Sequence, residues 1–105
     1  MKYLMSAILV LALVFAVSNA AIDAKQLFLD KKCNSCHSID ALKIAKTNAN
    51  SKAADLSTVG KVRTAEFLTK YLKKEADIDG KKHGVAFKGT DEEFKAMVDW
   101  LAGLK

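Results

Sequence analysis

The sequence contains no proline, five glycines and two cysteines in 105 residues, and only 8% of its residues are aromatic. Few turn-forming residues argue against a many-stranded β-sandwich or barrel, because those folds need frequent tight turns. Two cysteines are too few for a disulfide-rich scaffold or a four-cysteine zinc site. Half of the residues are hydrophobic and 28% are charged, which excludes disordered and fibrous classes. The composition therefore predicts one small, all-α domain.

Residues 1–20 have the pattern of a secretory signal peptide. Lys2 precedes an apolar run from Leu4 to Val17, and small residues follow up to Ala20. An uncleaved membrane anchor is the alternative, but the run is shorter than the roughly 18 residues that a spanning helix needs. We expect cleavage after Ala20, export to the periplasm or a similar compartment, and no membrane span in the remaining domain of residues 21–105.

Three amphipathic segments predict the main helices of this domain. The first runs from Ala21 to Lys32, the second begins at the N-cap residue Thr64, and the third begins at Thr90 with a capping box. Residues 38–59 and 77–89 lack a helical period and are predicted to be long loops, the first with one or two short helical turns. The coarse prediction is three helices joined by long loops.

The most informative motif is the pentapeptide Cys33-Asn34-Ser35-Cys36-His37. A thioredoxin-like redox pair needs a βαβ context, a lone disulfide leaves His37 without a role, and a zinc site needs further ligands. Covalent haem attachment explains all three residues, because two thiols add to the porphyrin vinyl groups and the adjacent imidazole reaches the iron. A large cofactor also supplements the small core. We predict one haem c bound by Cys33 and Cys36, with His37 as the proximal iron ligand.

Residues 21–105 resemble a small monohaem class I cytochrome c of the bacterial type. Beyond the haem motif, the similarity lies in Phe28, in the segment 56–68 before the middle helix, and in the segments 87–94 and 98–101 of the final helix. The resemblance implies an all-α cytochrome c fold, with three main helices and long loops around one covalent haem. In that family the first and last helices cross, so we expect Phe28 to pack against Trp100 in the core.

Two features depart from the family pattern. The family usually has Gly-Pro after the haem motif, where a backbone carbonyl holds the proximal imidazole, and a chain without proline leaves that partner of His37 unidentified. The family also places a methionine ligand in the loop before the final helix, and this loop has none. Met97 lies within the helix, in register with core positions. His83 lies in the loop and is predicted to be the distal ligand, with an open or water-bound iron, Lys81, Lys82 or Met97 as alternatives.

Two protein ligands leave no iron position for a substrate, so the predicted function is single-electron transfer and not enzyme catalysis. Imidazole in place of a methionine thioether predicts a low reduction potential. If His83 is not a ligand, the open iron predicts a gas- or peroxide-binding protein, as a sensor or weak peroxidase. A haem relay subunit of a larger complex is a further alternative.

The charge pattern bears on partners. Eight lysines lie in sequence around the haem motif and the two loops: Lys31, Lys32, Lys43, Lys46, Lys61, Lys81, Lys82 and Lys88. In the resembling family, such lysines steer docking to acidic redox partners, whereas the alternative is an ordinary solvated surface. Nucleic-acid binding is not expected of an exported protein.

Overall fold

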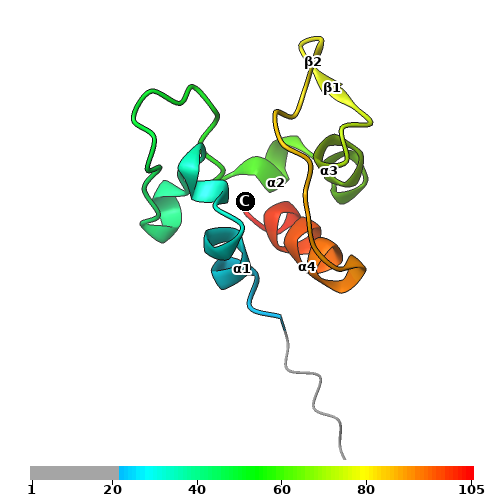
Figure 1. Ribbon diagram of the computed structural model, residues 1–105, viewed down its shortest axis with the longest axis horizontal. Coiled ribbons are helices and arrows are strands. Elements are labelled where there is room, and N and C mark those ends of the chain that lie inside the picture. Colours follow the sequence, from blue (N-terminus) through cyan, green and yellow to red (C-terminus); the bar gives the residue numbers. More distant parts are fainter. Residues whose placement is uncertain (1–21) are drawn as a thin grey trace, which may run out of the picture.

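The computed structural model describes residues 22–105 (Figure 1), so the predicted signal peptide and its cleavage site lie outside the described residues. The described part is mostly helical, which confirms the all-α prediction. Its elements are α1 (Ala24–Asp30), 3-10 helices at Cys33–Ser35 and Asp40–Leu42, α2 (Val59–Val62), α3 (Ala65–Leu72), β1 (Asp77–Ile78), β2 (Lys81–Lys82) and α4 (Asp91–Ala102). Within these residues no helix is both long and apolar enough to cross a membrane.

The predicted helix starts agree with the capping contacts. The Thr64 hydroxyl accepts a hydrogen bond from the first turn of α3 at 3.1 Å. At α4, Thr90 and Glu93 form a complete capping box, with each side chain bonded to the other residue's backbone N–H. The first helix is shorter than the predicted Ala21–Lys32. Asp23 caps its start. Lys32 has a φ of 58°, in the left-handed region, so a right-handed helix cannot continue through it.

The core lies where α4 packs against both α1 and α3 (Figure 1). The rings of Phe28 and Trp100 lie 5.7 Å apart at 58°, a tilted aromatic pair that confirms the predicted contact between the first and last helices. Met97 is 1% exposed and belongs to this core, as its register predicted. The buried side chains come from three helices and from the turn at residues 39–44: Leu27, Phe28, Ile39, Ile44, Leu68, Met97, Val98 and Leu101.

The short helix α2 is fixed against the end of α4 by a close backbone approach. The Gly60 N–H donates to the Leu104 carbonyl at 2.7 Å. A Cβ at Gly60 would lie 2.0 Å from the Ala102 carbonyl oxygen, so only glycine fits here.

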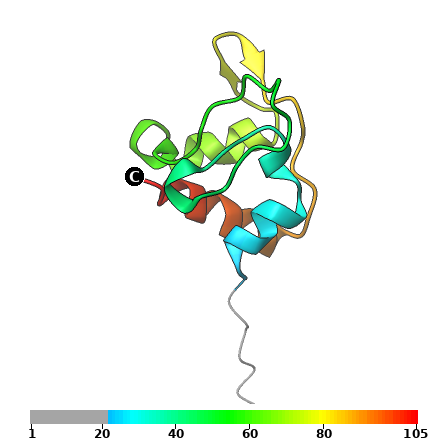
Figure 2. The same cartoon turned by 90° about the vertical axis from the view of Figure 1, so that its left-hand side faces the viewer.

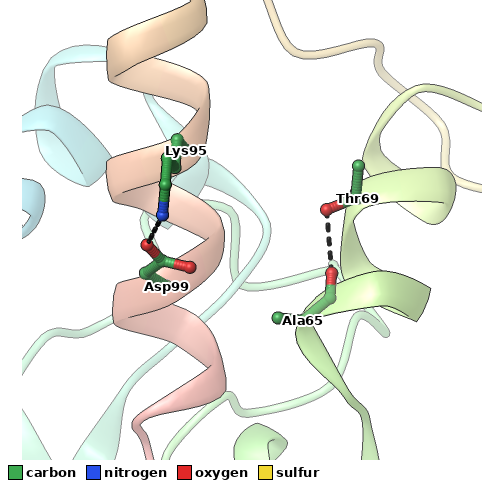
Figure 3. A network of polar contacts seen from close by, with 4 residues as sticks. All are labelled: Ala65, Thr69, Lys95 and Asp99. Carbon is green, nitrogen blue, oxygen red and sulfur yellow. Dashed lines mark hydrogen bonds and ion pairs between the residues drawn. The ribbon is translucent and has the colours of Figure 1, made fainter.

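Two polar contacts at the pocket between α3 and α4 each stay within one helix (Figure 3). Lys95 pairs with Asp99 one turn further along α4, and the Thr69 hydroxyl donates to the Ala65 carbonyl in α3 at 2.8 Å. These contacts do not link the two helices. Their packing therefore depends on apolar side chains.

The sequence predicts a loop throughout residues 77–89. This prediction is wrong for the first part of the segment. Strands β1 and β2 form an antiparallel hairpin in which Ile78 lies opposite Lys81. Asp79 and Gly80 occupy the tight turn with φ values of 52° and 77°, the positive region that Asp-Gly pairs favour in two-residue hairpins. The hairpin projects beyond the helices in both views (Figures 1 and 2).

Candidate functional site

The haem motif folds into one tight turn after α1. Residues Cys33–Ser35 form a 3-10 helix, and the N–H groups of Cys36 and His37 both donate to the Cys33 carbonyl, at 3.3 and 3.0 Å. Neither cysteine forms a disulfide; Cys33 is half-buried and Cys36 is exposed. Burial raises the pKa of the Cys33 thiol. The turn therefore presents two thiols and one imidazole from five consecutive residues.

A backbone carbonyl orients the imidazole of His37. His37 Nδ1 lies 2.7 Å from the Ala54 carbonyl oxygen. Because a carbonyl can only accept, Nδ1 donates its proton, and the lone pair of the imidazole is then on Nε2. Burial lowers the pKa of His37, the Ala54 carbonyl opposes this, and the nearby His83 lowers the pKa further. The neutral ring is the form that binds a metal.

The Ala54 carbonyl supplies the partner that the sequence left unidentified. It belongs to a loop that also binds the backbone of the haem motif. Three carbonyl groups of the motif accept hydrogen bonds of 2.9 to 3.0 Å from this loop: Asn34 from Thr47 N, Ser35 from Asn48 N, and Cys36 from Ser51 Oγ. The loop at residues 47–54 thus supports both the backbone of the motif and the ring of His37.

His83 approaches from the opposite segment, directly after β2. Its ring is half-buried, and its Nδ1 donates to the Val85 carbonyl at 2.5 Å. The edge of Tyr71, from α3, lies against the imidazole with ring centres 5.3 Å apart. The alternative ligands Lys81 and Lys82 are both exposed on β2.

The structure brings the two predicted histidine ligands together. The ring centres of His37 and His83 are 6.1 Å apart, and the ring planes differ by 10°. Two imidazoles that bind opposite sides of one metal ion through Nε2, at about 2 Å each, have ring centres about 6 Å apart. In both residues Nδ1 is bonded to a carbonyl, which leaves Nε2 free for a metal. These residues fit one haem c.

The two histidines belong to different sides of the molecule. The motif and the loop at residues 38–58 lie on one side, and α3 with the hairpin lies on the other (Figures 1 and 2). Within residues 22–105, no three histidine, cysteine or acidic side chains gather as a metal-binding group.

Comparison with known proteins agrees with this site. The family model described as Cytochrome c matches residues 21–105, which include the haem motif, both histidines and all described helices. No curated protein and no solved structure matched the chain. Members of this family carry haem c attached to two cysteines at the spacing of Cys33 and Cys36, and they transfer electrons. Fold, motif and family match agree that this chain is a small c-type cytochrome and belongs to the cytochrome c family.

Proposed function

We propose that the protein is a low-potential single-electron carrier in which His37 and His83 are the two axial ligands of one haem c. The observation that supports this most is the placement of the two rings, 6.1 Å apart and nearly parallel, with both Nδ1 atoms bonded to carbonyls. When bound, the haem supplies an iron that takes up and releases one electron. The two imidazoles fill both axial positions, so a substrate has no place to bind, which favours electron transfer over catalysis.

The ligand set argues for a low potential. A methionine thioether raises the potential of a haem, and the only methionine within residues 22–105 is buried in the core as Met97. The carbonyls of Ala54 and Val85 accept the Nδ1 protons of the two histidines, and such acceptors make an imidazole a stronger electron donor. Stronger donors stabilise the oxidised iron. Both effects lower the reduction potential.

The location and the docking surface are also part of this proposal. The pattern of residues 1–20 supports export and cleavage after Ala20. The family points to redox proteins as partners. The eight lysines named in the sequence analysis are all exposed, which supports an acidic docking partner. Two of them, Lys81 and Lys82, form the exposed strand β2 directly before His83.

Replacement of His83 tests the proposal. The oxidised wild-type protein is expected to be low-spin, without the far-red band of methionine-ligated haem, and the reduced protein is expected not to bind carbon monoxide. His83→Ala opens one axial position, so it should give a high-spin spectrum and rapid carbon monoxide binding. His83→Met should raise the reduction potential.

Lys82→Ala is the matched control, because it removes a neighbouring alternative ligand and should leave the spectrum unchanged. A high-spin wild-type protein would contradict the proposal and favour gas or peroxide binding. A low-spin protein that is unaffected by His83→Ala would assign the distal position to another residue, with Lys81 and Lys82 the first to examine.

A further inference from the structure

We propose that Asp55 is a positioning residue for the proximal imidazole: its carboxylate holds the Ala54 carbonyl at His37 Nδ1 and so sets how strongly His37 donates to the iron. This inference depends on the part of the proposed function that makes His37 a ligand. It does not depend on His83.

The carboxylate of Asp55 connects the two segments that meet at His37. Its Oδ2 accepts from the Ser38 hydroxyl at 2.7 Å and from the Asp40 N–H at 2.9 Å. Its Oδ1 accepts from the Ser57 N–H at 2.9 Å. One side chain next to Ala54 in the sequence is therefore bonded to the residue that follows His37 and to the turn beyond it.

The turn that is hydrogen-bonded to Asp55 is itself packed into the core. Ile39 is fully buried and pairs with the buried Ile44 through two backbone hydrogen bonds of 2.9 and 3.1 Å. Ile39 lies between Ser38 and Asp40, so both of these donors to Asp55 have a fixed position. The Leu56 N–H also donates to the Ser38 carbonyl at 2.9 Å. Asp55 thus connects the buried turn to the segment that carries the Ala54 carbonyl and restrains its position.

The position of that carbonyl matters for the chemistry of His37. An acceptor on Nδ1–H pulls the proton away from the ring and increases the electron density that Nε2 offers to a metal. Ala54 has no polar side chain of its own that could restrain its carbonyl, so the position of the carbonyl depends on the bonds of its neighbours. Without its side-chain anchor, the Ala54 carbonyl should move away from Nδ1. His37 would then donate less, and the oxidised iron would be less stable.

Asp55→Asn in the haem-loaded protein tests this with little change in shape. The single amide oxygen of asparagine serves only one of the N–H groups of Asp40 and Ser57, and its NH2 group faces the other donor. We expect the reduction potential to rise. We also expect the Nδ1 proton of His37, followed by NMR, to exchange with solvent on the order of tenfold faster, because its acceptor is released.

Asp40→Asn is the matched control. It removes the same charge from a residue bonded directly to Asp55, but Asp40 contributes only its backbone N–H to the bonds described above. Any rise in potential that comes from charge alone should appear in both variants. A larger rise in Asp55→Asn, together with faster Nδ1 exchange only in that variant, supports the inference.

Equal potentials in the two variants with unchanged Nδ1 exchange would overturn it, as would a lower unfolding midpoint with an unchanged potential. If Asp55→Asn yields no haem-loaded protein, Ser38→Ala removes one of the three donors and keeps the carboxylate. A smaller rise in potential supports the inference, and no rise contradicts it. The two proposals are tested by different measurements. The spectrum of the wild-type protein tests the proposed function, and the Asp55 variants test only the role of Asp55.

Discussion

His37 and His83 approach each other from two segments that are anchored in different ways. The segment of His37 is bonded to a distant loop through Ala54, Ser51 and Asp55, and the turn that follows it buries Ile39 in the core. The imidazole of His83 donates to a carbonyl only two residues away, in a loop whose Val85 is 66% exposed. The ring of His37 is thus held by a hydrogen bond to a distant loop, whereas the hydrogen bond of the His83 ring is local and its tertiary contact is with the ring of Tyr71.

The loop at residues 83–87, which we call the distal loop, is attached to the body of the protein at Phe87 as well as through the contact of His83 with Tyr71. The Phe87 N–H donates to the Leu72 carbonyl at the end of α3, at 3.1 Å. The ring of Phe87 packs against Phe94 with centres 5.2 Å apart, and the Lys31 ammonium lies 5.8 Å from its centre. Because His83 lies four residues before this anchor, we expect the distal side to open more easily than the proximal side.

Replacement of both cysteines should abolish haem attachment and folding, and with them any difference in stability between the two sides. Cys33→Ala combined with Cys36→Ala leaves no covalent attachment for haem, and a core this small depends on the cofactor. We expect a colourless, largely unfolded chain. Haem staining after denaturing electrophoresis and far-UV circular dichroism measure this, and a folded variant with bound pigment would contradict it.

Two truncations of aliphatic side chains should sharpen the comparison. Ile39→Ala, on the proximal side, removes a fully buried side chain and should lower the free energy of unfolding by about 3 kcal/mol. Val85→Ala, beside the distal histidine, removes an exposed side chain and should change it by less than about 0.5 kcal/mol. Denaturant titration of both haem-loaded variants measures the difference. Equal effects would mean that the two sides are anchored equally.

Met97 belongs to neither side of the site, and its replacement should be nearly silent in the spectrum. Met97→Leu conserves volume in the core, so it should cost less than about 1.5 kcal/mol and leave the visible spectrum unchanged. Thermal unfolding and absorption spectra check both expectations. Loss of the low-spin spectrum would instead make Met97 a ligand.

Asp55 also adds a pH dependence to the stability of the proximal side. Hydrogen bonds from Ser57, Ser38 and Asp40 hold the pKa of its carboxyl well below the usual range, although partial desolvation opposes them. A lowered folded pKa stabilises the protein above the unfolded value of about 3.9, and this contribution is lost as the pH falls below it. The difference in unfolding free energy between wild type and Asp55→Asn should therefore shrink as the pH falls below about 4. A difference that stays constant in acid would contradict this.

The features predicted from the residues themselves depend on local chemistry, whereas the long-range contact of Phe28 with Trp100 was predicted from the family resemblance. The motif from Cys33 to His37 and the caps at Thr64 and Thr90 were read from residues that are close in the sequence. The Ala54 carbonyl was not predictable, because every residue has one and this one lies 17 positions from His37. The bonds of Asp55 were hidden for the same reason, since two of its three partners lie 15 and 17 positions away.

The hairpin is a different case, because a signal for it was present. Asp79-Gly80 is a strong turn pair, but the lysines of β2 offer no apolar face that would indicate a strand.

The pairing of α1 with α4 has a consequence for synthesis of the chain. Phe28 lies in α1, and its partner Trp100 lies in α4. Contacts between residues so far apart in sequence close a long loop, which slows folding. A growing chain cannot complete this core until α4 has been synthesised. Removal of α4 should therefore leave the haem motif on an unfolded polypeptide.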